Sequence, residues 1–271
     1  MEKIFNRRAE LLFDNTKVSG DDLDIGFEVE FDFFPEPNMG KVWVYNVSKD
    51  TAAKIRQSKQ VILNAGYGQD IGTVMVGGVY RVAEYVERTD TLIEVDIYDQ
   101  PNMWGRRIKT TYRGRTTAMS IISDITATYG LKIGKYDLPR NVIYNRGKMI
   151  DATIEGLLRE LAADCGARLY ITDGSVYILP EGEPESRSVV TVLDSDTGLL
   201  GVSRIDLRGL KEDQNEITEG VKVQMLFNHR IRANSIIRVK GVLIAGLYQV
   251  ISGKHISNSY STEVDCVPVR G

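Results

Sequence analysis

Residues 40–46 read GKVWVYN and residues 78–82 read GVYRV, and both stretches have counterparts near the end of the chain. The counterparts are residues 220–228, GVKVQMLFN, and residues 246–250, GLYQV. In each copy an alternating segment ends at Asn, a second apolar segment follows, and a Gly-apolar-Tyr-polar-Val segment comes next. The pattern predicts a duplicated β structure, with a chance likeness between two β-rich segments as the alternative.

The first region, residues 1–100, has the period of two that is typical of strands. Residues 27–33, FEVEFDF, alternate apolar and acidic side chains and predict a half-buried antiparallel strand. Gly77-Gly78 predicts a bulge or sharp bend of the kind that closes a barrel. Ser48 or Asp50 is expected to cap a short helix. The remaining expected elements are strands at 41–47, 60–67, 73–87 and 91–98 and a helix at 51–57.

The middle region, residues 101–195, changes to helical periodicity and predicts an α+β arrangement. Two helices are expected, one near 116–129 and one near 151–165 with Asp151 as its cap. Asp173-Gly174 has the composition of a tight β-turn. A hairpin over 168–179 and a strand at 188–193 complete this region.

The last region, residues 196–271, returns to the strand pattern. We therefore expect a mainly β chain with an α+β insertion. Two small β-barrels, in residues 1–100 and 196–271, would flank the α+β region of residues 101–195.

The composition is that of a globular protein: of 271 residues, 42% are hydrophobic and 26% are charged. The net charge is −3, so no overall basic field favours nucleic acid. The acidity is local, because residues 1–100 carry a net charge of −7 and each later region carries +2. No stretch approaches the length of a membrane span, and Cys165 and Cys266 are expected to be reduced thiols.

Glu28, Glu30 and Asp32 form an acidic row on one face of the first predicted strand. Alternate residues of a strand lie about 6.6–6.8 Å apart, a spacing at which two carboxylates could hydrolyse glycosidic bonds. A solvated acidic face is the favoured interpretation. Such a face would repel polyanions if it lined a channel.

The densest basic cluster comprises Arg106, Arg107, Arg113 and Arg115, with Trp104 just before it. We interpret it as a candidate contact with another subunit or a partner protein. Binding to nucleic-acid phosphates is the alternative, although nothing else in the chain is strongly basic.

Other motifs point to no chemistry. Residues 66–72 have a GxGxxxG spacing that does not fit a dinucleotide loop, and Asp21, Asp22 and Asp24 lack the glycine and final glutamate of a calcium loop. Neither His229 nor His255 stands in a catalytic motif. We therefore expect no enzyme activity, no cofactor and no metal.

The order of these features resembles the tail baseplate hub proteins of bacteriophages and related contractile injection machines. The resemblance runs from about residue 10 to residue 268 and rests on strand and turn patterns. One departure is His229 where family members often have proline, and another is Ala233-Asn234 where they often have Pro-Gly. The residues that carry it are 42–96, the helices near 116–129 and 153–165 with the following ARLYITDGSVYILP, and TGLLG at 197–201 with the two strands after it.

The resemblance implies two tail-tube-like barrels per chain and a ring-shaped homotrimer. Six barrels would match a sixfold tail tube, and the threefold axis would match a central spike. The expected partners are the chain itself, the spike, the tail tube and other baseplate proteins, with DNA only in transit through the lumen. The chain would be made in the host cytoplasm and reside in the virion tail baseplate. A tail-associated cell-wall-degrading enzyme and a nucleic-acid-binding module are the alternatives.

Overall fold

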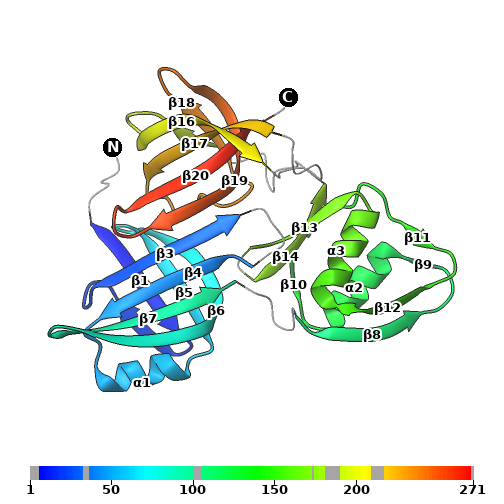
Figure 1. Ribbon diagram of the computed structural model, residues 1–271, viewed down its shortest axis with the longest axis horizontal. Coiled ribbons are helices and arrows are strands. Elements are labelled where there is room, and N and C mark those ends of the chain that lie inside the picture. Colours follow the sequence, from blue (N-terminus) through cyan, green and yellow to red (C-terminus); the bar gives the residue numbers. More distant parts are fainter. Residues whose placement is uncertain are drawn as a thin grey trace. The chain divides into compact units, whose positions relative to one another are not determined.

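The computed structural model divides the chain into two compact units (Figure 1). The β unit holds the first and last parts of the chain, Met1–Phe33, Asn38–Tyr98 and Ser186–Gly271, and the α+β unit holds Phe34–Pro37 and Asp99–Glu185. The residues that the structure describes are 6–32, 37–99, 105–172, 174–180, 190–208 and 217–269.

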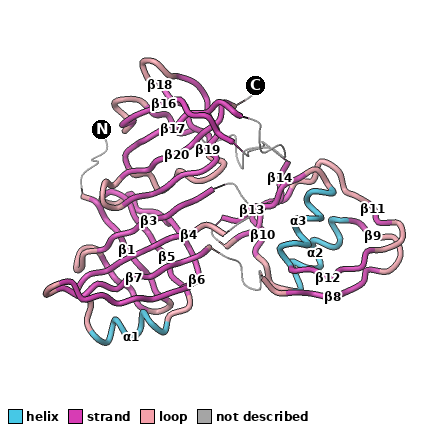
Figure 2. Tube along the Cα trace, viewed as in Figure 1, coloured by secondary structure: helices cyan, strands magenta, loops and turns pink. Residues whose placement is uncertain are grey.

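The first half of the β unit is an antiparallel sheet with one helix (Figure 2). Its strand order is β3-β4-β7-β6-β5-β1-β2. We call this half the first barrel. Its elements are β1 (Arg7–Phe13), β2 (Thr16–Ser19), β3 (Ile25–Asp32), β4 (Met39–Tyr45), α1 (Lys49–Gln57), β5 (Gln60–Tyr67), β6 (Asp70–Glu87) and β7 (Asp90–Tyr98).

The second half, which we call the second barrel, has the order β16-β17-β20-β19-β18, with β15 parallel to β18 at the end. This order repeats β3-β4-β7-β6-β5 strand for strand. The duplication suggested by the sequence is therefore present in the fold. The strands are β15 (Val190–Leu193), β16 (Leu199–Arg208), β17 (Ile217–Leu226), β18 (Ile236–Lys240), β19 (Ala245–Ile256) and β20 (Ser261–Pro268).

One strand was assigned to the wrong region. The sequence placed the strand near 188–193 in the α+β region, but β15 pairs with β18 of the second barrel. Leu193 is buried there in the core of that barrel, and burying this side chain is favourable.

The two barrels share one thirteen-stranded sheet, because β3 pairs with β19. Lys254 lies opposite Glu30, and Ile256 lies opposite Glu28. Each barrel still has its own core. The first contains Leu11, Phe13 and Ile93, and the second contains Val223 and Val250, all at most 1% exposed.

The long strand β6 changes partner at Gly78. This glycine pairs with Gln60 of β5 on one side and with Tyr98 of β7 on the other, and beyond it β6 continues with β7 alone. The expected bend at Gly77-Gly78 is therefore a change of partner. The register breaks lie elsewhere, at Val74 and Tyr80.

The α+β unit places two helices between a β-ribbon and a three-stranded sheet (Figure 1). Apolar side chains of both helices meet those of β8, β12, β13 and β14 in one core. The elements are β8 (Arg107–Tyr112), β9 (Thr116–Thr117), α2 (Ala118–Thr128), β10 (Lys132–Tyr136), β11 (Ile143–Tyr144), β12 (Lys148–Thr153), α3 (Ile154–Asp164), β13 (Ala167–Thr172) and β14 (Ser175–Pro180).

Helix ends follow local side-chain chemistry. Ser48 caps α1, as the sequence allowed, and Thr117 caps α2. The cap of α3 is Thr153, whose hydroxyl accepts from the Gly156 N–H at 3.1 Å. The predicted cap Asp151 is wrong, because its carboxylate pairs with Arg107 across the β8–β12 ribbon.

The hairpin expected over 168–179 consists of β13 and β14, with Thr172 opposite Ser175. Gly174 has φ +67°, which suits a tight turn, and Asp173 lies outside the described residues. Of the helices in the described ranges, none is long and apolar enough to cross a membrane.

Candidate functional site

Cross-strand pairing gathers charged side chains on one face of the β unit, because residues directly opposite in a sheet point to the same side. We call these residues the charged face. The sign of the charge alternates from strand to strand. In strand order, the members are Lys222 of β17, Glu263 and Asp265 of β20, Lys254 of β19, Glu28, Glu30 and Asp32 of β3, Lys41 of β4, Glu94 and Asp96 of β7, and Arg81 of β6.

The predicted acidic row lies in the middle of the charged face. Glu28 and Glu30 are 41% and 63% exposed, and both face Lys254, which contacts Glu28 and lies 3.7 Å from Glu30. The hydrogen bond with Glu28 raises the pKa of Lys254 despite partial burial. Sequence reasoning missed this lysine because it lies more than two hundred residues away.

The other cations of the charged face are also held by carboxylates. Lys41 lies 3.2 Å from Glu94 and 3.9 Å from Asp96. Arg81 donates to Asp96 at 2.6 Å and to Glu94 at 3.0 Å. The face therefore presents more carboxylates than basic groups, and each of its basic groups already has an acidic neighbour.

Both barrels use the same pair of residues at equivalent positions. Lys41 lies 3.9 Å from Asp96 in the first barrel, and Lys222 lies 3.8 Å from Asp265 in the second. The sequence Glu-Val-Asp occurs at 94–96 and again at 263–265. These matches define which residue of one barrel corresponds to which residue of the other.

A shallow groove of about 370 Å³ lies beside Glu28 and Glu30 and is lined by Met39, Tyr80 and Tyr98. A glycosidase needs one carboxyl group kept protonated by an apolar environment. Glu28 and Glu30 instead share one lysine and face solvent. Neither carboxylate therefore lies in the apolar environment that such a general acid requires.

The basic cluster divides into two parts. Arg107 is bound to Asp151 at 2.8 Å, and Arg106 lies over the ring of Tyr129 at 5.3 Å. Arg113 and Arg115 are exposed on either side of Gly114. Trp104 lies outside the described residues.

Arg146 joins Arg113 and Arg115, and sequence reasoning missed it. The next residue, Gly147, has φ +80°, and a Cβ there would lie 2.2 Å from the Tyr112 carbonyl oxygen. Only glycine lets the two loops approach so closely. Within the described part of the chain, these three arginines have no ion-pair partner, which leaves a basic loop pair available to another molecule.

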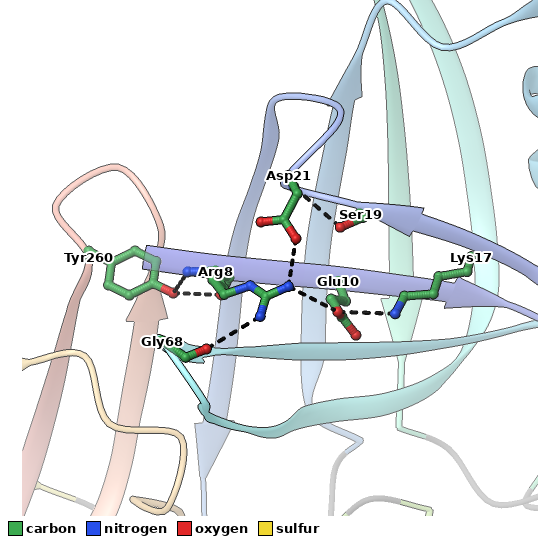
Figure 3. A network of polar contacts seen from close by, with 7 residues as sticks. All are labelled: Arg8, Glu10, Lys17, Ser19, Asp21, Gly68 and Tyr260. Carbon is green, nitrogen blue, oxygen red and sulfur yellow. Dashed lines mark hydrogen bonds and ion pairs between the residues drawn. The ribbon is translucent and has the colours of Figure 1, made fainter. Parts of the chain in front are cut away.

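Tyr260 of the second barrel joins the backbone of the first (Figure 3). Its hydroxyl oxygen lies 2.6 Å from the Gly66 carbonyl oxygen and 2.8 Å from that of Arg8, and it accepts from both residues' N–H groups at 3.2 Å. Burial raises the pKa of Tyr260 to about 12. Arg8 and Gly66 are directly opposite on β1 and β5, so one side chain bonds to both strands.

Charged groups extend this junction along β1. Arg8 donates to Asp21 at 2.6 Å and lies 3.9 Å from Glu10, which Lys17 approaches to 3.1 Å (Figure 3). On the other side, Arg230 binds Asp70 through both guanidinium nitrogens at 2.8 and 2.5 Å. The contacts of Arg8, Glu10, Lys17 and Asp21 lie within the first barrel. The Arg230–Asp70 pair, like Tyr260, joins the second barrel to the first.

Both histidines pack against other residues of the β unit. His255 is buried between Thr262 and the Ile231 carbonyl oxygen, and burial lowers its pKa to about 3. The His229 ring packs on Gly72. The free thiols Cys165 and Cys266 are both buried. No group of three or more His, Cys, Asp or Glu in the described ranges is arranged to hold a metal ion.

Solved structures that are similar to this chain include two tail proteins and a component of the type VI secretion system. The chain matches a tail protein from Neisseria meningitidis with a TM-score of 0.66 and 9% identity, over 97% of this chain and 96% of the other. A prophage MuSo2 43 kDa tail protein from Shewanella oneidensis matches with a TM-score of 0.64 and 10% identity, over 97% of this chain and 98% of the other. An Escherichia coli component of the type VI secretion system matches with a TM-score of 0.66 and 11% identity, over 96% of this chain and 77% of the other. That protein is itself similar in structure to T4 phage tail proteins.

At such low identities the likeness concerns the fold, and the fold is that of phage tail proteins. No protein-family model and no curated protein sequence matches the chain.

Proposed function

We propose that the chain is a structural baseplate hub subunit of a bacteriophage tail. Three copies form a ring that adapts the sixfold tail tube to the threefold central spike during tail assembly and DNA delivery. The subunit is synthesised in the host cytoplasm and resides in the virion.

The repeated barrel carries this proposal. One chain holds two barrels with the same strand order, joined edge to edge through β3 and β19. Three such chains present six similar barrels around a threefold axis, which is what a connection between sixfold and threefold structures requires. The tail-protein fold of the neighbours supports the same role.

Within the ring, we place the charged face, with Glu28, Glu30 and Asp32 at its centre, toward the lumen. Its excess of carboxylates repels a polyanion. Its cations are held by neighbouring carboxylates, so they offer phosphates no free counter-charge. DNA would then pass without being retained.

The α+β unit supplies contacts to the spike, the tube or other baseplate proteins. Arg113, Arg115 and Arg146 are the part of the basic cluster that is open for such a contact. Trp104, Arg106 and Arg107 complete the candidate contact cluster, with Arg107 held by Asp151.

The test is assembly from purified components. Light scattering during size exclusion is expected to give the mass of three chains, alone or after addition of the spike or tube protein, and negative-stain images are expected to show rings. A stable twofold dimer that persists with both partners present would contradict the proposal.

A further inference from the structure

Several strand edges of the β unit have no partner strand among the described residues, including those of the four-residue strands β2 and β15. Two of these open edges are longer. One is the far part of β6, Arg81–Glu87, which pairs with β7 only. The other is the outer edge of β16, which pairs with β17 only. Open edges of this length are templates for pairing with another chain.

These two edges correspond to the two strands that meet inside the chain. By strand order, β6 corresponds to β19 and β16 corresponds to β3. The far part of β19 pairs with β3 to join the barrels. The open edge of β6 therefore corresponds to the edge of β19 that pairs with β3. The open edge of β16 corresponds to the edge of β3 that pairs with β19.

We infer that β6 of one copy pairs antiparallel with β16 of a second copy, in the register that β19 and β3 use within the chain. This inference rests on the proposed ring and names the surfaces that close it. The contact is head-to-tail, because it joins two different surfaces, and contacts of this type build rings. Junctions within and between chains then alternate around the ring.

The register follows from residue correspondence. Ala83 of β6 lies opposite Glu94, and Lys254 of β19 lies opposite Glu263. Because these two glutamates are equivalent, Ala83 corresponds to Lys254. Two residues later, Tyr85 corresponds to Ile256. Ser203 and Glu28 lie opposite the equivalent lysines, Lys222 and Lys41. Because Ile256 lies opposite Glu28, Tyr85 of one copy is expected opposite Ser203 of the next.

The side chains on the two edges suit such a contact. Tyr85 and Val86 are large apolar side chains that are 42% and 73% exposed on β6, and Leu200 is 54% exposed on β16. The same register brings Glu84, which pairs with Arg56 in its own chain, opposite Arg204, a residue of opposite charge. Arg204 is exposed and has no ion-pair partner in the described part of its own chain.

Disulfide trapping tests the register directly. In the template junction, the Ser257 N–H donates to the Phe27 carbonyl oxygen at 2.9 Å. The neighbouring pair, Ile256 and Glu28, is therefore of the non-hydrogen-bonded type, with Cα atoms close enough for a disulfide. The variant Y85C/S203C in the full-length chain is expected to form disulfides between copies under mild oxidation.

The readout is the mass on a non-reducing gel, with most of the chain expected in covalent dimers and larger species that disappear on reduction. The matched control is Y85C/K222C. Lys222 lies opposite Ser203 but one strand farther from the edge, beyond disulfide reach of Tyr85. Each single variant controls for random oxidation.

The outcomes separate this inference from the proposed hub. Absence of Y85C/S203C products at every concentration, or equal products from the control, would overturn the edge pairing. If rings still form with the spike or tube protein, the hub proposal survives that failure. If covalent species accumulate as open chains that never close at three copies, the edge pairing holds and the hub proposal fails.

Discussion

At the scale of single residues, Tyr260 is the side chain on which the junction between the barrels most depends. Replacing it by Phe leaves the Arg8 and Gly66 N–H groups near an apolar ring edge without their acceptor. Y260F is expected to lower the free energy of unfolding by about 2 kcal/mol, since buried donors lose their partner.

Chemical denaturation of Y260F measures this loss. Tyr80→Phe is the control, because Tyr80 is 72% exposed, and its change is expected to stay within about 0.5 kcal/mol. Equal effects of the two variants would show that the Tyr260 hydroxyl contributes nothing specific.

His255 predicts a pH dependence of stability. Burial depresses its pKa from 6.5 to about 3 in the folded chain. The unfolded chain therefore binds more protons between these values, and stability falls as the pH falls from 6.5 toward 3. The contribution of this one group is about 1.4 kcal/mol per pH unit.

The measurement is the slope of unfolding free energy against pH between about 4 and 6 in the wild type and in H255Q. The variant is expected to have the smaller slope. An unchanged slope would mean that His255 is already protonated in the folded chain.

The carboxylates of Glu28 and Glu30 are expected to weaken the binding of polyanions to the charged face. Replacing both with Gln removes the two carboxylates that pair with Lys254. Glu263, opposite on β20, then remains as its acidic neighbour, and the Lys254 charge is more available to phosphate or sulfate groups. E28Q/E30Q is expected to bind heparin more tightly than the wild type, with an affinity that falls as salt rises.

The matched control for this variant is D22N/D50N, which makes the same change of charge at two exposed sites away from Lys254. Equal heparin affinity in the two variants would show that net charge, and not the release of Lys254, governs binding.

At the scale of elements, Asp151 and Thr153 were both possible N-caps of α3 by sequence, and the structure shows that Thr153 is the cap. Asp and Thr are both good caps, but Asp151 is engaged by Arg107 across the ribbon. Thr153→Ala is expected to lower stability by about 1 kcal/mol. Asp151→Asn is expected to lower stability much less than Thr153→Ala does, because an exposed ion pair contributes little.

Thermal or chemical unfolding of both variants gives the comparison. A larger loss of stability in the Asp151 variant than in the Thr153 variant would indicate that Asp151 is the cap.

Clean alternation made β3 predictable, and its absence hid β1. β3 alternates from Phe27 to Asp32, whereas β1 carries Leu11, Leu12 and Phe13 in succession. Leu12 points away from the core and is 36% exposed, which hides the period of two. The strand β2 was not predicted, because its four residues are too few to show a period.

The candidate contact sites show the same limit. The charges of the acidic row and of the arginine loop could be read from neighbouring residues in the sequence. Their partners could not, because Lys254 reaches the row through strand pairing, and Arg146 reaches the loop through a glycine that allows close backbone approach. Local patterns specify elements, and long-range register specifies sites.

At the scale of the whole molecule, the repeat was visible in the sequence but its consequence was not. The two copies of the strand order could be suspected from GKVWVYN and GVKVQMLFN. The pairing of β3 with β19, which turns two barrels into one sheet, depends on segments far apart in the chain. This pairing also reveals which edges are left for a neighbouring copy.

The central claim is that three copies of this two-barrel chain close into a ring. The most direct measurement is the solution mass by light scattering from dilute to concentrated protein, repeated with the spike and tube proteins. The account predicts a discrete species of three chains and rings in negative-stain images. A chain that stays monomeric with both partners present, or that forms a closed twofold dimer, would contradict it.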